Sequence, residues 1–415
     1  MIRRGRHGGA FPVTVRSSSP TVWAALAACA VICAAPRQGL AQPVDFTGYV
    51  LGLGTYVGES SVAVSGASAF QRLRGMATWR RDRFHVDAAY EHTLNLRESG
   101  VQGAQLFTAG GASSNGDWLD LGGTIEERES VVWRHRVDRL AMSIELTDNA
   151  ELIVGRQPIS WATTLVFTPA DPFSPFDPSD PFREYRQGVD AARLRVYPGA
   201  VSEIDFVVRR SDFGFQETTT AAVRGSTSVG GWDVAAWAGL VHDEGAGALA
   251  VSGSVGSWAI RAEGSLRESE EADATVRATL GVDRRFTLDG RDLYLVMEIS
   301  HDGFGLDDVS DLAQLAGSDA LRRGELQSLG SDQAVLQASY QLHPLAGVSG
   351  LVLVNLHDGS ALLAPGASYS ASPNTSIQGG AYLSVGDGDV DAFGVPGSEY
   401  GGVPGVVYVS VSWFL

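Results

Sequence analysis

The sequence predicts an all-β protein, a single transmembrane antiparallel β-barrel of about 18 strands, within a range of about 16–18. Three observations lead to this prediction. Many segments of about 8–12 residues alternate apolar and polar side chains, as a strand with one apolar and one polar face does. Tight turns and long connections follow one another along the chain. No apolar run of 18 residues follows residue 41, so no membrane-spanning helix is expected there.

Composition excludes several classes of function. The 415-residue chain carries 31 basic residues, all of them Arg, against 48 acidic ones, for a formal net charge of −17. Without Lys there is no Walker-type phosphate loop and no Schiff-base chemistry. Both cysteines, Cys29 and Cys33, lie near the N-terminus, so the rest of the chain has no thiol nucleophile, thiolate metal site or disulfide. The acidic balance argues against a nucleic-acid partner.

Residues 1–41 have the layout of a secretory signal peptide, which would carry the chain through the inner membrane. Arginines precede an apolar stretch of 15 residues at 21–35, and small residues at Gly39 and Ala41 suit cleavage after Ala41. A lipoprotein box at Leu26–Cys29 and a twin-arginine signal at Arg3-Arg4 are the alternatives. The remaining residues, 42–415, are predicted to form one barrel domain.

The alternation is regular enough to place the strands. In residues 83–95, for example, Phe84, Val86 and Tyr90 share one face, while Asp87 and Glu91 share the other. The candidate strands lie near residues 46–57, 70–80, 83–95, 131–146, 151–157, 188–197, 201–209, 218–227, 232–242, 248–255, 258–267, 274–283, 292–300, 332–342, 348–356, 361–371, 376–385 and 405–415.

Every second connection between these strands is a tight turn. The tight turns are Arg81-Asp82, Thr147–Ala150, Pro198-Gly199, Gly230-Gly231, Gly256-Ser257, Leu288–Gly290, Pro344–Gly347 and Pro373-Asn374. The other connections are longer, and the longest are 96–130, 158–187, 301–331 and 386–404. Short turns at one end and long loops at the other are typical of outer-membrane barrels, whose turns are periplasmic and whose loops are extracellular.

Aromatic residues support the same prediction. Six of them lie beside a tight turn or the chain end, in the apolar register: Trp79, Phe84, Trp232, Trp258, Tyr340 and Trp413. This placement is typical of an aromatic girdle at a membrane interface. The alternative, a set of core aromatics in a soluble β protein, does not explain why they gather at strand ends.

The last strand carries a family resemblance. Val407, Val409, Val411, Trp413 and Leu415 form an apolar face that runs to the end of the chain, with Phe414 next to last. This pattern resembles the terminal strand of Gram-negative outer-membrane β-barrels, which usually end in Phe. The resemblance implies that this strand closes the barrel and is recognised by the barrel assembly machinery.

A second stretch points to a broad group within that class. Residues 155–161 (GRQPISW), a loop rich in Pro, Phe and Asp, and residues 186–194 (RQGVDAARL) resemble a segment of porin-like and polysaccharide-export-like barrels of about 18 strands. The resemblance implies an outer-membrane channel for small polar solutes. A polysaccharide export channel and a non-conducting adhesin or scaffold are the alternatives.

The implied partners are outer-membrane lipid, lipopolysaccharide and a transported solute, in a monomer or a homotrimer. We expect neither an enzyme nor a cofactor, because no mature-chain His lies in a recognisable catalytic motif with Ser or Asp.

The polar register of the strands supplies the candidate lumen residues. The pore-lining candidates are Arg72, Arg74, Arg134, Arg136, Arg156, Arg193, Arg195, Glu203, Asp205, Arg261 and Glu263. Because Arg is dense here, a basic wall that attracts anionic solutes is one hypothesis. The alternative is cross-strand ion pairing, since Arg193 and Arg195 lie across the Pro198-Gly199 turn from Glu203 and Asp205.

The connection at 158–187 is the candidate constriction loop. Five prolines between residues 169 and 181 suppress strand pairing, and its phenylalanines need an apolar environment. If the loop folds into the lumen, its selectivity residues would be Asp171, Asp177, Asp180, Arg183, Glu184 and Arg186. A loop that caps the barrel from outside is the alternative.

No metal site is predicted. Residues 386–391 (GDGDVD) resemble the start of a calcium loop, but Ala392 and Ser398 stand where such a loop requires Gly and Glu. We therefore expect a solvated acidic loop. Loose divalent-cation binding is the alternative there and at Asp302, Asp307, Asp308 and Asp311. Residues 311–328 suit a short helix.

Overall fold

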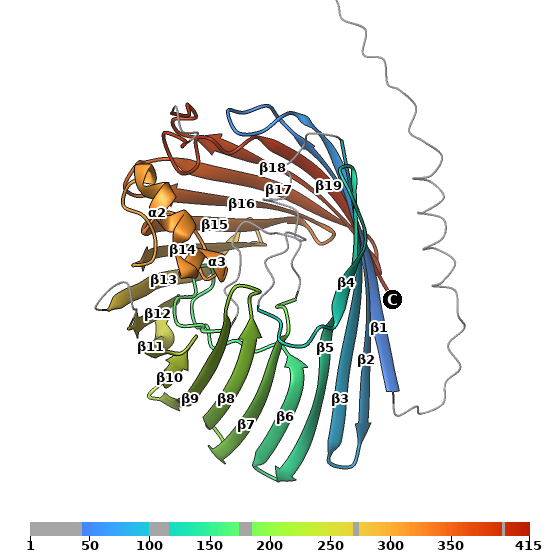
Figure 1. Cartoon of the computed structure of the whole chain (residues 1–415), viewed down its shortest axis with the longest axis vertical. Helices are drawn as coiled ribbons and strands as arrows, with labels where there is room; N and C mark the ends of the chain where they lie inside the picture. The colour runs from blue at the N-terminus through green and yellow to red at the C-terminus, as the bar shows by residue number, and fades with distance from the viewer. Residues whose placement is uncertain (1–43, 99–115, 174–184, 269–273, 392–394) are drawn as a thin grey trace, which may run out of the picture. The chain divides into compact units, whose positions relative to one another are not determined.

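A computed structural model describes residues 44–98, 116–173, 185–268, 274–391 and 395–415 (Figure 1). Residues 43–414 make up one compact unit. The predicted signal peptide at 1–41 lies outside the described residues, so it stays a prediction. Among the described residues, no helix is both long and apolar enough to cross a membrane.

One antiparallel sheet of nineteen strands makes up the fold. The strands are β1 (Val44–Val57), β2 (Gly66–Arg81), β3 (Phe84–Arg97), β4 (Gly122–Arg128), β5 (Val131–Thr147), β6 (Ala150–Gln157), β7 (Val189–Gly199), β8 (Ser202–Asp212), β9 (Glu217–Val229), β10 (Trp232–Val241), β11 (Glu244–Val255), β12 (Trp258–Arg267), β13 (Thr275–Leu288), β14 (Arg291–Asp302), β15 (Asp332–His343), β16 (Ala346–Asn355), β17 (Ala361–Ser372), β18 (Thr375–Val385) and β19 (Val406–Phe414). The sheet closes because β1 pairs with both β2 and β19.

Eighteen of these strands form the ring, and β4 is an addition to it. Residues 140–147 of β5 pair with β6, while residues 131–136 pair with β4 along the same edge of the strand. The other edge of β5 pairs with β3. β6 ends at Gln157, and β4 therefore takes its place beside the rest of β5. The predicted all-β barrel of about 18 strands is confirmed, whereas β4 was not predicted.

The two ends of the barrel have different connections. At one end every connection is two residues long, and several use positive φ angles, as hairpin turns of type I′ require. Gly230 and Gly231, with φ of 60° and 83°, form one such turn. The predicted tight turns are confirmed, except that β2 runs through Arg81 and β7 through Gly199, so their turns lie at 82–83 and 200–201.

The opposite end carries connections that range from two residues to about 30, and the segment 303–331 is among the longest. That segment contains a 3-10 turn, η2 (Val309–Asp311), and two short helices, α2 (Leu312–Gly317) and α3 (Asp319–Arg322). Both helices are labelled in Figure 1. They fall within the stretch where the sequence predicts a short helix.

The outer face of the barrel is apolar. Val407, Val409 and Val411 of β19 are each about half exposed, and Leu249 of β11 is 71% exposed. The strand registers place the six predicted girdle aromatics on this same face. A closed barrel with an apolar outer belt and aromatic residues near its turns is suited to an outer membrane.

Candidate permeation pathway

The inner face of the barrel divides into two regions. From β2 to β14 its register carries most of the predicted arginines and acids, and we call this surface the charged wall. The inner face of β15–β19 is the neutral wall. After Asp332, the described residues of these five strands include no Asp, Glu, Lys or Arg, and Leu353, Leu362 and Val406 face inward.

Most arginines of the charged wall are paired with acids on neighbouring strands. Arg193 lies 2.6 Å from Asp205, and Arg195 lies 3.0 Å from Glu203, across the β7–β8 hairpin. These are the pairs that hairpin spacing predicts. Arg261 lies 2.9 Å from Asp283 on β13. The charged wall is thus a mixed surface of both signs.

A second group of ion pairs joins β2, β3 and β5. Arg74 is almost fully buried, pairs with Glu91 and lies 2.6 Å from Asp138. The ring of Tyr185 stacks on Tyr49 at 5.9 Å and lies 4.8 Å from the Arg74 guanidinium. Tyr185, which lies in the connection between β6 and β7, therefore packs on the inner surface of β1 and β2.

Arg156 differs from the expectation that it lines the pore. Its guanidinium is fully buried, donates to both carboxylate oxygens of Asp190 at 2.8 and 2.7 Å, and also donates to the Leu119 carbonyl. Strict alternation is broken just before it at Gly155, whose φ is +119°. A Cβ on Gly155 would lie 2.2 Å from the Leu140 carbonyl oxygen. Arg156 thus joins the strands to residues 117–121 and does not face lumen water.

Other predicted arginines have different surroundings. Arg136 lies 3.0 Å from Asp117. Arg72 is buried, with its guanidinium 5.3 Å from the Phe70 ring. Arg134 and Arg224 are partly exposed on the inner face, and neither has an ion-pair partner within 4 Å among the described residues.

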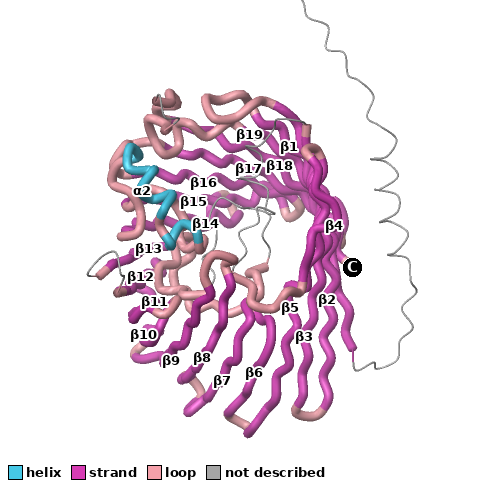
Figure 2. Tube along the Cα trace, in the orientation of Figure 1, coloured by secondary structure: helices cyan, strands magenta, loops and turns pink. Residues whose placement is uncertain are grey.

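Residues 158–173 run inside the ring of strands, where Figure 2 shows loop segments. The Trp161 indole donates to Asp205 at 2.9 Å. Glu263 accepts the backbone N–H groups of Thr163, Thr164 and Ala170 at 2.7–3.1 Å. We call residues 158–173 the inward segment, because hydrogen bonds join it to inner-face side chains of β8 and β12.

Farther along, the inward segment reaches β14. Glu298 accepts the backbone N–H groups of Leu165, Val166 and Phe167 at 2.7–3.0 Å. Glu298 and Glu263 are both almost fully buried. A buried carboxylate needs several donors to offset the loss of hydration, and three backbone N–H groups supply them at each site.

The tip of the inward segment packs on the neutral wall. Val166 and Phe167 belong to one buried apolar cluster with Val335, Leu353 and Leu362, together with residues of β18 and β19. This cluster is a hydrophobic core located inside the barrel. The inward segment therefore spans the interior from the charged wall to the neutral wall.

Of the predicted constriction-loop residues, Asp171 and Arg186 are described. They form an ion pair at 2.6 Å, and Asp171 also accepts from the Ser160 hydroxyl at 2.8 Å. The others lie outside the described residues: Asp177, Asp180, Arg183 and Glu184. Their role in selectivity stays a prediction.

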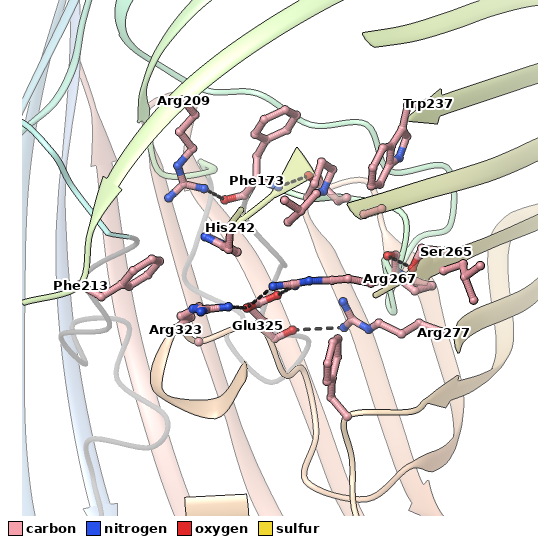
Figure 3. A pocket seen from close by; sticks show the side chains of 18 residues that line it. Phe173, Arg209, Phe213, Trp237, His242, Ser265, Arg267, Arg277, Arg323 and Glu325 are labelled. Atoms are coloured by element: carbon pink, nitrogen blue, oxygen red, sulfur yellow. Dashed lines mark hydrogen bonds and ion pairs between the residues drawn. The ribbon is translucent and has the colours of Figure 1, made fainter. Parts of the chain in front are cut away.

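A charged cavity lies on the long-connection side of the inward segment (Figure 3). Arg267 pairs with Glu325 and with Glu244, the latter at 2.5 Å. Arg277 lies 2.7 Å from Asp302. His242 is buried beside them, and burial lowers the pKa of this imidazole to about 3, so it is neutral at ordinary pH. The positive charges of this cavity are therefore balanced by neighbouring carboxylates.

Several residues of the pathway are absent from the sequence-based candidates. Glu325 follows the short helices, Gln327 accepts from the Thr168 backbone N–H at 2.6 Å, and Glu399 accepts from Gln333 at 2.7 Å. These residues lie in long connections that fold inward. Alternation identifies strand faces only, so no signal in the sequence marks them.

Comparisons with known proteins concern the fold. No family model and no curated protein matches the sequence. Three solved structures resemble the chain over 91% of its length. A BenF-like porin from Pseudomonas fluorescens Pf-5 has a TM-score of 0.54, 11% identity and 100% of its own chain covered.

The other two are OccAB1 of Acinetobacter baumannii, with a TM-score of 0.54, 8% identity and 98% coverage, and OccK2 (OpdF) of Pseudomonas aeruginosa, with 0.52, 11% and 99%. At such identities the similarity establishes the architecture alone. The chain thus has the fold of Gram-negative outer-membrane porins, and the resemblance read from its terminal strand is confirmed at that level.

Proposed function

We propose that the protein is an outer-membrane channel for small polar solutes, whose pathway is narrowed by the inward segment. The observation that supports this best is the path of residues 158–173, which are bonded to Glu263 and Glu298 on one side and packed on Leu353 on the other. A ring of 18 strands is wide enough for an aqueous lumen, so a segment fixed across it sets the narrowest passage.

A preference for anionic solutes is the finer part of the proposal. It rests on Arg134 and Arg224, which face the interior without an ion-pair partner among the described residues. The paired arginines contribute little net field, because each lies close to a carboxylate. Inner-wall guanidinium groups with no carboxylate within 4 Å attract anions and repel cations.

Planar-bilayer recording of the reconstituted mature protein tests both parts. We expect discrete channel openings and, under a KCl gradient, a reversal potential of the sign set by chloride. Polymers of graded size added to the bath distinguish a small-solute channel from a polysaccharide export channel. A cation-selective current would overturn the anion preference, and an absence of current would favour the non-conducting adhesin or scaffold.

Arginine substitutions test whether Arg134 and Arg224 set the anion preference. The double variant Arg134→Ala with Arg224→Ala should move the reversal potential toward zero. Arg210→Ala is the control, because Arg210 is paired with Glu217 at 2.8 Å on the opposite face of β8. An equal shift in the control would show that the two inner arginines do not set selectivity.

A further inference from the structure

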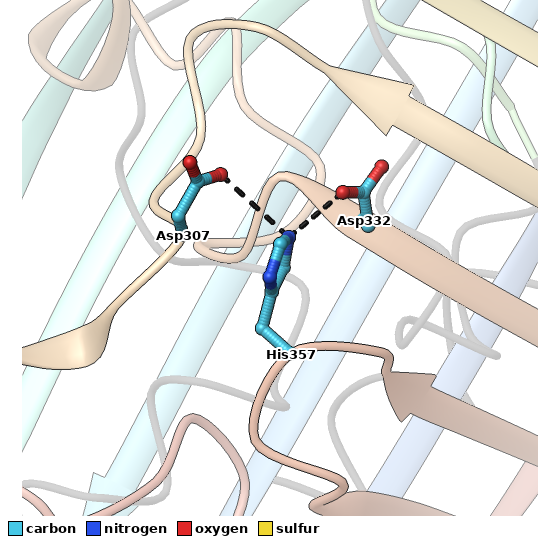
Figure 4. Close-up of side chains that lie close together, drawn as sticks. All are labelled: Asp307, Asp332 and His357. Atoms are coloured by element: carbon cyan, nitrogen blue, oxygen red, sulfur yellow. Dashed lines mark hydrogen bonds and ion pairs between the residues drawn. The ribbon is translucent and has the colours of Figure 1, made fainter.

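A cluster of metal-ligand side chains lies at the end of the barrel that carries the long connections (Figure 4). It consists of Asp307, Asp332 and His357, whose ligand atoms all lie within 4.8 Å of one another. Asp307 belongs to the 303–331 connection, Asp332 begins β15, and His357 follows β16. Three separate segments therefore bring their side chains to one point.

Acceptor atoms converge on a single nitrogen in this cluster. The Nε2 of His357 lies 2.7 Å from Asp332 Oδ2 and 3.6 Å from Asp307 Oδ1. The Ser331 hydroxyl, which donates to Asp307 Oδ1 at 2.6 Å, has its oxygen 3.0 Å from the same nitrogen. A neutral imidazole nitrogen has at most one proton to donate, whereas a cation interacts with all of these acceptors at once.

We propose that Asp307, Asp332 and His357 form a binding site for a divalent transition-metal ion such as Zn²⁺. An imidazole with two carboxylates suits zinc, while calcium and magnesium prefer oxygen donors alone. Tetrahedral zinc ligands at about 2.0–2.1 Å from the metal lie about 3.3 Å from one another. The 3.6 Å contact of His357 with Asp307 fits this, and the 2.7 Å contact with Asp332 needs to open by about half an ångström.

A second histidine positions one of the ligands. The Nδ1 of His301 lies 2.9 Å from Asp332 Oδ1, the carboxylate oxygen that does not face His357. His301 and Asp332 are also paired residues in the β14–β15 register. Such outer partners fix the orientation of ligating groups, so His301 is a positioning residue. Asp307 is 81% exposed and the other three side chains are partly exposed, which leaves the site open to ions from the solvent.

The bound ion would join the 303–331 connection to the barrel rim. Gln327 in this connection accepts from the backbone of the inward segment at Thr168. The site thus lies on the loop layer that contacts the pathway, yet its ligands are outside the proposed pathway. Absence of metal binding would not contradict the proposed channel function, because conductance and metal binding are measured separately.

Isothermal titration of the untagged, EDTA-treated mature protein in detergent tests the proposal. We expect saturable binding of one Zn²⁺ per chain from ZnCl₂ and none from CaCl₂. Asp307→Asn and His357→Ala should each weaken Zn²⁺ binding by at least about tenfold, and His301→Ala by about tenfold. Retained channel conductance shows that each variant is folded.

The matched control is His85→Ala. His85 forms another described His–Asp contact, 3.1 Å to Asp87, without a third ligand, so its loss should leave Zn²⁺ binding unchanged. Absence of stoichiometric binding, equal binding of Ca²⁺, or undiminished binding in His357→Ala would each overturn the proposal. If the variants do not fold, Co²⁺ bound to the wild-type protein decides: intense tetrahedral d–d bands support the site, and weak octahedral bands contradict it.

Discussion

On the charged wall the inward segment is bound through hydrogen bonds, six of which join its backbone to the carboxylates of Glu263 and Glu298. On the neutral wall its tip lies against aliphatic side chains such as Leu353 and Leu362. The two walls belong to the same ring of strands and alternate by the same period. On the charged wall Ile159, Trp161, Ala170 and Phe173 also pack in an apolar cluster with β7–β11, so the two sides differ in the directional bonds that only the charged wall adds to apolar burial.

The two modes of contact have different consequences. Loss of one partner of a buried ion pair strongly destabilises the fold, because the remaining charge is still removed from water but no longer has an opposite charge beside it. Apolar contacts lose stability gradually as buried volume is removed. We therefore expect the charged wall to respond more sharply to substitution than the neutral wall.

The largest effect is expected for Arg156→Met. This change leaves the buried Asp190 carboxylate without its guanidinium partner and should destabilise the barrel by about 3–5 kcal/mol. Urea unfolding in lipid vesicles measures it. Arg285→Met is the control, because its pair with Asp292 is about half exposed and should contribute at most about 1 kcal/mol. Equal losses in the two variants would remove the distinction between buried and exposed pairs.

On the neutral wall, Leu353→Ala should cost about 2–3 kcal/mol in the same assay, since it opens a cavity in the buried cluster that contains Val166 and Phe167. Ser339→Ala, on the same wall but exposed, should lie within about 0.5 kcal/mol of the wild type. A cost for Leu353→Ala no larger than that of the control would mean that the tip does not rest on this wall.

A smaller effect is expected for Glu298→Gln. The amide has one acceptor oxygen in place of two, so three backbone N–H groups compete for it, and the anchor should weaken by about 1–2 kcal/mol. Greater open-channel current noise measures the looser segment. Glu203→Gln is the control, because Glu203 pairs with Arg195 and has no hydrogen bond to the inward segment among the described residues. Unchanged noise in Glu298→Gln would contradict the anchoring role.

The smallest effect is expected for Ser349→Asp, which places a negative charge on the exposed inner face of β16. Anion preference should fall slightly in dilute KCl, as the reversal potential reports. The shift should shrink at 1 M salt, where the screening length is only about 3 Å. A salt-independent shift would indicate a change in structure in place of a change in field.

The sequence predicted the parts of this molecule that depend on local pattern. Alternation and turn residues located the strands of the ring, and hairpin spacing predicted the pairing of Arg193 and Arg195 with Asp205 and Glu203. β4 was missed because its residues, 122–128, lack alternation and become a strand only through pairing with β5.

Contacts between distant parts of the chain could not be predicted from alternation and turn residues. The bonds from Glu298 to residues 165–167 join positions more than 130 residues apart. The cluster of Asp307, Asp332 and His357 joins the 303–331 connection, the start of β15 and the segment after β16. Strict alternation from Val154 would place Arg156 on the lipid-facing side of β6, whereas the irregular Gly155 lets the structure bury it against Asp190. Contacts that depend on the closed ring leave no periodic trace in the sequence.

The inward segment narrows the passage, and a cysteine probe tests this most directly. The chain has no cysteine after Cys33, so Leu165→Cys supplies a single thiol on the mature protein. Leu165 is 40% exposed, although its backbone is bonded to the inner-face Glu298. A charged methanethiosulfonate added during bilayer recording should lower the single-channel current of this variant and leave Leu249→Cys, on the lipid-facing surface, unchanged. An unaltered current in modified Leu165→Cys would contradict the account.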